Sequence, residues 1–406
     1  MAPLDVGIVA PSKVAEDLVG LYLKNSAGVP LKISLRDWVG KIEWPEEEAD
    51  FYRNDHLGEV GLRILHVLMN ECSRIRTLNI DGVFGTSSDL LNAPAWLIKA
   101  IEEAPALRSV TADFLHENEH PALPYSKLVT LTIPMMLGAN TFWTRLPECS
   151  SLQTLSITRF VNPFQTQINH ALELPTLRHF SVHADDLPSI LGVLPKHLEF
   201  PNLQTLELTY DGEIITEGDV AHQEFIVEWE WPCPAFRSIA RSSSLSLKRL
   251  SISFKRHALS DSAAQQLVQM CPNLTHLSVY TVADVASFTE TLLSQLIPSP
   301  DDREVRNKVA MPKLSSIELS FGNGRSRLMT SHIAQLIADV MAFRSNATHD
   351  RHGFFVASLT VFRLKLTGPR TDFVDTESVS SDEARRFWEI LNTLEKDFGA
   401  NLTVEG

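Results

Sequence analysis

One apolar pattern recurs along the chain: an apolar residue, two variable positions, then two more apolar residues separated by one variable position. Its copies begin at Ile75, Leu107, Leu128, Leu152, Leu177, Leu203, Leu247, Leu274, Leu314 and Leu359. In each copy the last apolar pair alternates with mostly small or polar residues, and this period of two predicts a strand with one buried face. The first apolar residue of each copy is expected to enter the same core from the preceding turn.

The spacing of the copies indicates a repeat architecture. Consecutive copies are separated by 32, 21, 24, 25, 26, 44, 27, 40 and 45 residues. Five of these nine intervals lie between about 20 and 29 residues, the period typical of leucine-rich repeats. We interpret the longer intervals as insertions, and the segment PCPAFRSIA around Phe236 and Ile239 as a degenerate extra repeat turn. A single repeat cannot bury its apolar face, so neighbouring repeats must stack.

Helical periodicity fills several of the intervals between the predicted strands. Apolar residues recur at three- and four-residue steps in 57–72, 332–343 and 382–399. The segment 260–270 begins with Ser260 or Asp261 as a candidate N-cap. We therefore predict an α/β fold, a right-handed leucine-rich-repeat solenoid with irregular repeats, in which a concave parallel sheet is backed by convex helices.

The repeat pattern also predicts the domain organisation. Residues 1–406 are expected to form a single solenoid of about ten turns. Within it, 1–74 would supply N-terminal capping helices and a first strand, 75–366 the repeat body, and 367–406 a C-terminal loop, a capping helix and an end strand. The last helix carries a candidate capping box of Ser380 with Glu383 and ends near Gly399.

Composition and charge narrow the functional classes. Hydrophobic residues make up 44% and charged residues 21% of the chain, as in ordinary folded proteins. The net charge of −14 argues against nucleic acid or an anionic membrane as a partner. No stretch reaches the roughly 18 apolar residues of a membrane helix, and no signal peptide is evident. The four cysteines lie far apart, so we expect a cytoplasmic or nuclear location.

Two short motifs raise the question of catalysis. HENEH at 116–120 fits the H-E-x-x-H pattern of zinc hydrolases, in which both histidines bind the metal and Glu117 is the general base. Pro121 follows at once in a short interval, so a polar loop is the preferred interpretation. The histidines of 349–352 lie in a segment flanked by Gly and Asn, which favours a solvated turn. We expect no enzyme, no catalytic residue, no cofactor and no bound metal, with a zinc hydrolase as the alternative.

Strand geometry supplies the candidate binding residues. If the first, fourth and sixth positions of each repeat point inward, the third, fifth and seventh point outward. The early repeats present mostly Ser and Thr there, which strand propensity alone explains. The later repeats present side chains that folding does not need and that recognise partners. We predict that a partner protein binds the concave face through His179, His183, Glu207, Arg249, His276, Tyr280, Glu318, Arg363 and Lys365.

Within this set we expect Arg249, His276 and Tyr280 to lie side by side on adjacent strands and to form the centre of the contact. If they do not bind the partner, the hydrophilic inserts at 299–308 and 344–353 are the next candidates.

The N-terminal part of the chain carries a resemblance to a known family. VAEDLVGLYLKNSAGVPLKISL at 14–35 reads as a helix, a turn and a P-L-x-I-x-L strand, and SRIRTLNI follows at 73–80. From about Val14 to its end the chain resembles the leucine-rich-repeat portion of fungal F-box proteins. The resemblance implies the substrate-binding half of a ubiquitin ligase receptor. The F-box phrases L-P-x-E and C-x-x-W do not occur, so binding of the ligase adaptor is expected only if an F-box lies upstream. A free-standing scaffold or adaptor is a further alternative.

Overall fold

The computed structural model describes most of the predicted repeats. The described residues are 4–8, 12–26, 28–36, 58–81, 95–112, 123–134, 140–160, 172–184, 198–210, 234–254, 260–281, 286–297, 310–321, 331–345, 356–367, 381–398 and 401–405. By its internal contacts the chain divides into two compact units. Unit 1 comprises Met1–Ile168 and Leu172–Leu177, and unit 2 comprises Asn169–Ala171 and Arg178–Gly406. The single domain and the three segments expected from the sequence stay predictions.

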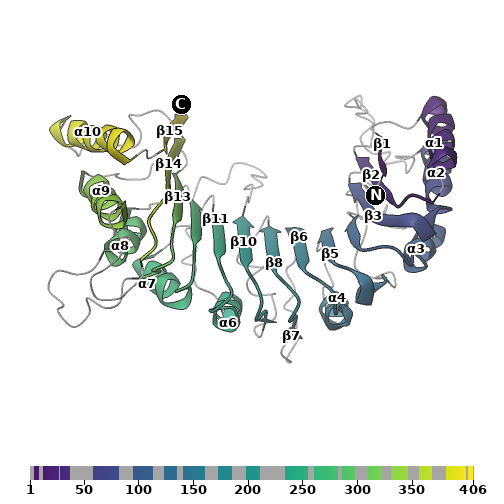
Figure 1. Ribbon diagram of the computed structural model, residues 1–406, viewed down its shortest axis with the longest axis horizontal. Coiled ribbons are helices and arrows are strands. Elements are labelled where there is room, and N and C mark those ends of the chain that lie inside the picture. The colour runs from purple at the N-terminus through teal and green to yellow at the C-terminus, as the bar shows by residue number, and fades with distance from the viewer. Residues whose placement is uncertain are drawn as a thin grey trace, which may run out of the picture. The chain divides into compact units, whose positions relative to one another are not determined.

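Unit 1 contains parallel strands that pair in chain order (Figure 1). They are β1 (Leu4–Ile8), β2 (Leu31–Arg36), β3 (Ile75–Asp81), β4 (Ser109–Ala112), β5 (Thr130–Pro134) and β6 (Thr154–Phe160), with the short β7 (Leu172–Glu173) beyond them. Its helices are α1 (Lys13–Asn25), α2 (Gly58–Met69), α3 (Ala95–Glu102) and α4 (Asn140–Arg145), with single 3-10 turns η1 (Cys72–Arg74), η3 (Tyr125–Lys127) and η4 (Leu146–Glu148).

Unit 2 also has a parallel sheet in chain order. Its strands are β8 (His179–Ala184), β10 (Thr205–Tyr210), β11 (Arg249–Phe254), β12 (His276–Thr281), β13 (Ser316–Phe321), β14 (Val361–Thr367) and β15 (Asn401–Glu405), with the short β9 (Leu198–Glu199) between β8 and β10 in sequence. Its helices are α6 (Pro234–Ser242), α7 (Asp261–Met270), α8 (Ala286–Gln295), α9 (Ser331–Ser345) and α10 (Ser381–Phe398). Figure 1 shows α7 to α10 following one another along one side of this sheet.

The strand prediction is confirmed at every copy of the repeat. All ten copies form strands in a parallel α/β arrangement. Wherever the structure describes their side chains, the three apolar positions of each copy are buried. Leu206 shows the packing: it is fully buried and pairs in register with Phe180 on one side and Leu250 on the other. Within each unit, buried positions therefore line up from strand to strand and form an apolar layer.

A regular hydrogen-bond ladder precedes the strands. The carbonyl oxygen of Gln204 accepts hydrogen bonds from the amides of both Lys248 and Arg249, each at 2.9 Å. The carbonyl of Lys248 in turn accepts from Thr275 and His276, at 2.8 and 3.0 Å. The second position of one repeat thus anchors the second and third positions of the next. This ladder satisfies backbone groups in the turns, which would otherwise lack partners in a buried setting.

Most of the helical segments expected from the sequence are present. The helices α2, α7, α9 and α10 lie where the periodicity placed them. The hydroxyl of Ser260 accepts a hydrogen bond from the amide of Ala263 at 3.3 Å, which confirms Ser260 as the N-cap of α7. The capping box is not tested, because Ser380 lies outside the described residues, as does Gly399.

One sequence-based interpretation is wrong. The segment around Phe236 and Ile239 is the helix α6 and not a degenerate repeat turn. Phe236, Ile239 and Ala240 are three and four residues apart and all are buried, so they form one apolar face of a helix. The strand β1 was also not expected, and the helices α3, α4 and α8 lie in repeat intervals where the sequence analysis placed no helix on particular residues.

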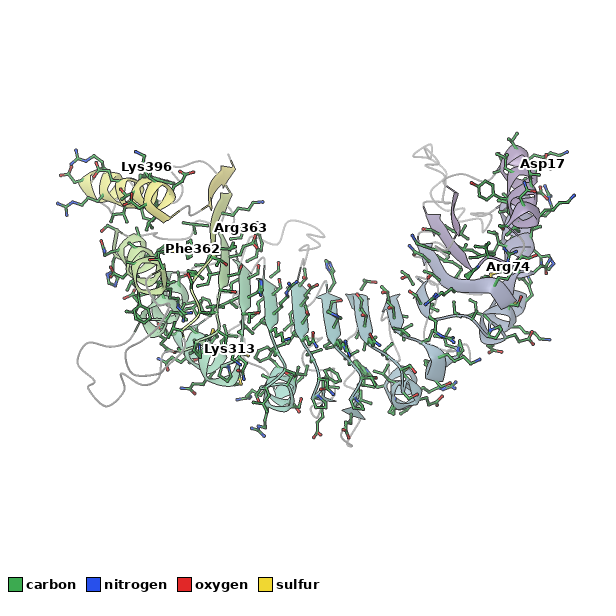
Figure 2. All side chains as sticks on the ribbon, in the orientation of Figure 1. Asp17, Arg74, Lys313, Phe362, Arg363 and Lys396 are labelled. Carbon is green, nitrogen blue, oxygen red and sulfur yellow. The ribbon has the colours of Figure 1, made fainter. Side chains whose placement is uncertain are left out.

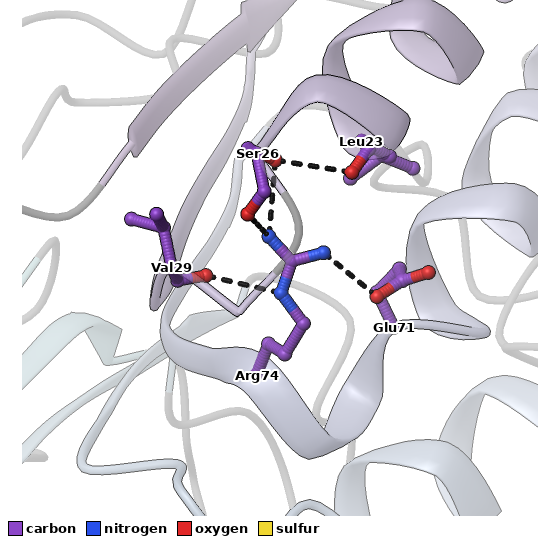
Figure 3. A network of polar contacts seen from close by, with 5 residues as sticks. All are labelled: Leu23, Ser26, Val29, Glu71 and Arg74. Atoms are coloured by element: carbon purple, nitrogen blue, oxygen red, sulfur yellow. Dashed lines mark hydrogen bonds and ion pairs between the residues drawn. The ribbon is translucent and has the colours of Figure 1, made fainter.

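Two arginines, one half-buried and one fully buried, connect turns to neighbouring elements. Arg74 is the last residue of η1, and its guanidinium donates to the carbonyl oxygens of Val29 and Ser26 and pairs with Glu71 at 2.9 Å (Figure 3). Ser26 and Val29 lie in the turn that leads into β2, and Glu71 precedes η1. Arg344, in the last turn of α9, is buried and donates to the carbonyl oxygens of the turn that leads into β13. In each case one cation satisfies several backbone carbonyls at once.

Candidate partner-binding face

The outward positions of the unit 2 strands form a face that we call the open face. Register pairing arranges them in three rows across the strands. The first row is His179, Thr205, Arg249, His276, Ser316 and Val361. The second row is Ser181, Glu207, Ser251, Ser278, Glu318 and Arg363, and the third is His183, Thr209, Ser253, Tyr280, Ser320 and Lys365.

All nine candidate residues from the sequence therefore belong to unit 2 and lie in these rows. Arg249 and His276 are direct register partners, as expected. Tyr280 is on the same strand as His276 but four residues further on, in the third row. At about 3.3 Å per residue it lies roughly 13 Å from His276 along the strand. The expected trio is thus a pair plus one residue at the far edge of the face.

The charged side chains of the open face are accessible. Arg249, Glu207 and Arg363 are exposed, and Glu318 is half-buried. Glu318 and Arg363 are direct register partners of opposite charge. Within the described part of the chain none of these four forms an ion pair. No described residue therefore neutralises the charge of these four side chains. Figure 2 shows Arg363 on β14.

His276 has the most altered electrostatic environment of the open face. Burial, with a second contribution from the nearby guanidinium of Arg249, lowers the pKa of its imidazole. Its Nδ1 lies 2.8 Å from the hydroxyl oxygen of Thr275. A lowered pKa keeps the ring neutral at neutral pH, and a neutral imidazole carries one donor and one acceptor nitrogen. His276 can therefore form a hydrogen bond with a polar group of a partner, next to the permanent positive charge of Arg249.

An exposed apolar stripe in unit 1 was not expected from the sequence. Val14, Leu18, Leu21 and Tyr22 on α1 are between 53% and 68% exposed. They are spaced by four, three and one residues and so lie on one side of the helix. Val19 and Leu23 occupy another side and are buried. Both sets are apolar at helical spacing, so the sequence could not distinguish the packed stripe from the exposed one. Exposed apolar clusters of this kind mark interaction surfaces.

The helix layer of unit 2 contains a polar hollow. It has a volume of about 370 Å³ and lies between α9 and α10, lined by Ser331, His332, Gln335, Arg386, Glu389 and Ile390. His332 pairs there with Glu290 at 3.2 Å. None of the nine candidate residues lines this hollow, so it is separate from the open face.

Most of the other candidate sites from the sequence lie outside the described residues. The motif at 116–120, the histidines of 349–352 and the insert 299–308 lie outside the described residues, and so does most of 344–353. Among the residues that are described, no group of three or more His, Cys, Asp or Glu side chains could hold a metal ion. Burial raises the pKa of the Cys271 thiol to about 12, so this thiol is protonated at neutral pH.

Comparisons with known proteins give no information on the function of this chain. No model of a protein family matches the chain, and no curated protein is similar to it at a significant level. In the part of the chain that the structure describes, no helix has the length and apolarity needed to cross a membrane.

Proposed function

We propose that this chain is a leucine-rich-repeat solenoid that acts as a non-catalytic protein-interaction module, with the open face of unit 2 holding the partner. The observation that carries the proposal is the content of the open face. Regular register places His179, Glu207, Arg249, His276 and Tyr280 outward, where strand formation requires none of them.

Two further features support an interaction protein. Four charged residues of the open face, Glu207, Arg249, Glu318 and Arg363, form no ion pair with another described residue. The apolar stripe of α1 offers a second exposed surface of a different character. Charged and aromatic groups on a rigid sheet supply the anchors that dominate protein–protein contacts, because the sheet loses little conformational entropy on binding.

We further propose that the module performs the substrate-binding half of an F-box-type ubiquitin ligase receptor. The support is the resemblance of 14–35 and 73–80 to that family, together with the helix, turn and strand that α1 and β2 form in 13–36. If an F-box lies upstream of this segment, a captured partner should carry ubiquitin in cells in which proteasomal degradation is blocked. A partner that is never modified would indicate a scaffold or adaptor instead.

The test compares two variants of the full chain in affinity capture from cell extract, with the captured proteins identified by mass spectrometry. The first, Arg249→Ala/His276→Ala/Tyr280→Ala, should lose the partner, because truncating a residue that anchors a partner costs about 2 kcal/mol or more.

The matched control is Arg241→Ala/Gln265→Ala/Lys396→Ala, which truncates three exposed helix residues of the same unit. It should retain the partner, and both variants should melt at the wild-type temperature. Capture that survives the first variant with an unchanged melting temperature would contradict the open face as the binding surface.

A further inference from the structure

The start of the unit 2 strands has an unusual charge composition. The second and third positions of the six repeats there are Arg178 and His179, Gln204 and Thr205, Lys248 and Arg249, Thr275 and His276, Ser315 and Ser316, and Thr360 and Val361. These twelve residues include three cations, two histidines and no carboxylate, in a chain with 50 acidic and 36 basic residues. These positions therefore carry a local positive charge in an acidic protein.

At the second position of these repeats, some side chains hydrogen-bond to the preceding repeat and others do not. The hydroxyls of Thr275, Ser315 and Thr360 donate to the carbonyl oxygen of the preceding repeat, at 2.9, 3.2 and 3.1 Å. These side chains hold the turns together. Arg178 and Lys248 occupy equivalent positions, but no described residue forms an ion pair with either, and both are exposed. The fold therefore does not explain why these two positions are cationic.

We infer that Arg178, His179, Lys248, Arg249 and His276, which we call the basic edge, bind an acidic segment of a partner protein. This inference rests on the proposed function and names the chemistry that the open face recognises. The chain as a whole is strongly acidic, so attraction of an anion is local to this edge. The closest carboxylate on the same strands is Glu207, which lies one row further along.

The dimensions of the basic edge define the ligand. From β8 to β12 there are three steps between paired strands, in the order β8, β10, β11 and β12. At about 4.8 Å per step the edge is about 14 Å long, which equals about four residues of extended chain. Arginine binds a carboxylate with two parallel hydrogen bonds, while lysine contributes a point charge. Because the Thr275 hydroxyl donates to the carbonyl of Lys248, the Nδ1–H of neutral His276 donates to Thr275, and its Nε2 can accept a hydrogen bond from a backbone amide of the bound segment. A run of about four Asp or Glu residues fits this edge.

The experiment measures binding of fluorescent peptides to the full-length chain by anisotropy. One peptide carries four consecutive glutamates between Gly-Ser flanks, and its control carries four glutamines. The glutamate peptide should bind at an ionic strength of about 50 mM and weaken as salt is added, because the contacts are exposed. The glutamine peptide should not bind. Equal binding of both peptides, or no binding of either, would overturn the inference.

Matched charge removal then tests the location. Lys248→Gln/Arg249→Gln should weaken the glutamate peptide by about tenfold. Arg386→Gln/Lys396→Gln removes the same charge from exposed positions of α10 and should weaken it by less than about twofold. Equal losses in the two double variants would show a general charge effect and overturn the assignment. Equally tight binding of single-stranded oligothymidylate at the basic edge would replace the acidic protein segment with a nucleic acid.

The outcomes also separate this inference from the proposed function. If the glutamate peptide does not bind but capture of a partner still depends on Arg249, His276 and Tyr280, the open face is a protein-binding surface and only the acidic ligand is wrong. If capture is also independent of these residues, the proposed function falls with it.

Discussion

Arg249 and His276 face outward as direct register partners on β11 and β12. Burial, and after it the guanidinium of Arg249, lowers the pKa of His276. We predict that Arg249→Gln raises the pKa of His276 toward its ordinary value near 6.5, because it removes one of the two causes and leaves burial in place. The measurement is an NMR titration of the imidazole. Lys396→Gln, which removes a charge from α10, should leave this pKa unchanged.

The same shift predicts how pH affects stability. The folded state holds His276 with a lowered pKa, so below about pH 6.5 the unfolded chain binds this proton more readily. The contribution of His276 to the free energy of unfolding therefore falls as the pH drops through this region. In His276→Gln the corresponding part of the pH dependence should be absent. Identical slopes for wild type and variant in urea titrations between about pH 7 and pH 5 would contradict the shift.

The strand register predicts a sharp contrast between two neighbouring residues. Leu206 is fully buried, whereas Thr205 is half-buried and points outward in the first row of the open face. Leu206→Ala should lower the free energy of unfolding by roughly 2–5 kcal/mol, because it leaves a cavity in the apolar layer. Thr205→Ala should cost less than about 1 kcal/mol. Chemical denaturation measures both values, and equal losses would show that the register is wrong.

The sequence predicted the strands well because two constraints coincide in each repeat. A period of two places Leu206 and Leu208 on one face, and stacking then requires the same positions to be apolar in the next repeat. The open face followed directly from this alternation. Arg249 and His276 could be matched from the amino-acid sequence alone, because both hold the third position of their repeats.

The remaining features depend on contacts that the sequence does not reveal. α1 has two apolar stripes, and only packing shows that Val19 is buried while Leu18 is exposed. The helix α6 was misread because Phe236 and Ile239, three residues apart, also fit the first and fourth positions of a repeat. The role of Arg344 depends on a turn thirty residues earlier in the chain, at Leu314.

The zinc-hydrolase alternative makes a separate prediction. We expect the purified protein to contain no stoichiometric zinc, because the motif at 116–120 is followed at once by Pro121 and its spacing favours a loop. Metal analysis of the full chain, purified without chelators, provides the measurement. Stoichiometric zinc that is lost in His116→Ala would overturn the non-catalytic assignment, because both histidines of the motif would then act as ligands.

Buried Arg344 should be a stability determinant of unit 2. Its guanidinium donates to the carbonyl oxygens of Ala310 at 2.8 Å, Leu314 at 2.9 Å and Met311 at 3.2 Å. Arg344→Met should lower the free energy of unfolding by roughly 2–4 kcal/mol, because buried carbonyls lose their donors. Arg344→Lys should recover only part of the loss, since an ammonium group cannot reproduce the forked geometry. Arg386→Met, at an exposed site on α10, should change the stability by less than about 0.5 kcal/mol.

Two glycines, one within α1 and one in the turn that follows it, should respond in opposite ways to the same substitution. Gly20 lies within α1, and a Cβ atom added there would meet nothing within 4 Å. Gly20→Ala should therefore stabilise the protein by about 0.5–1 kcal/mol, because it reduces the entropy of the unfolded chain and favours the helix. Gly28 has space as well, but its φ of +81° is a conformation that L residues rarely adopt. Gly28→Ala should destabilise by about 1 kcal/mol, since the strain exceeds the entropic gain. Thermal melting of the two variants measures the contrast, and a loss of stability in both would mean that α1 does not continue through Gly20.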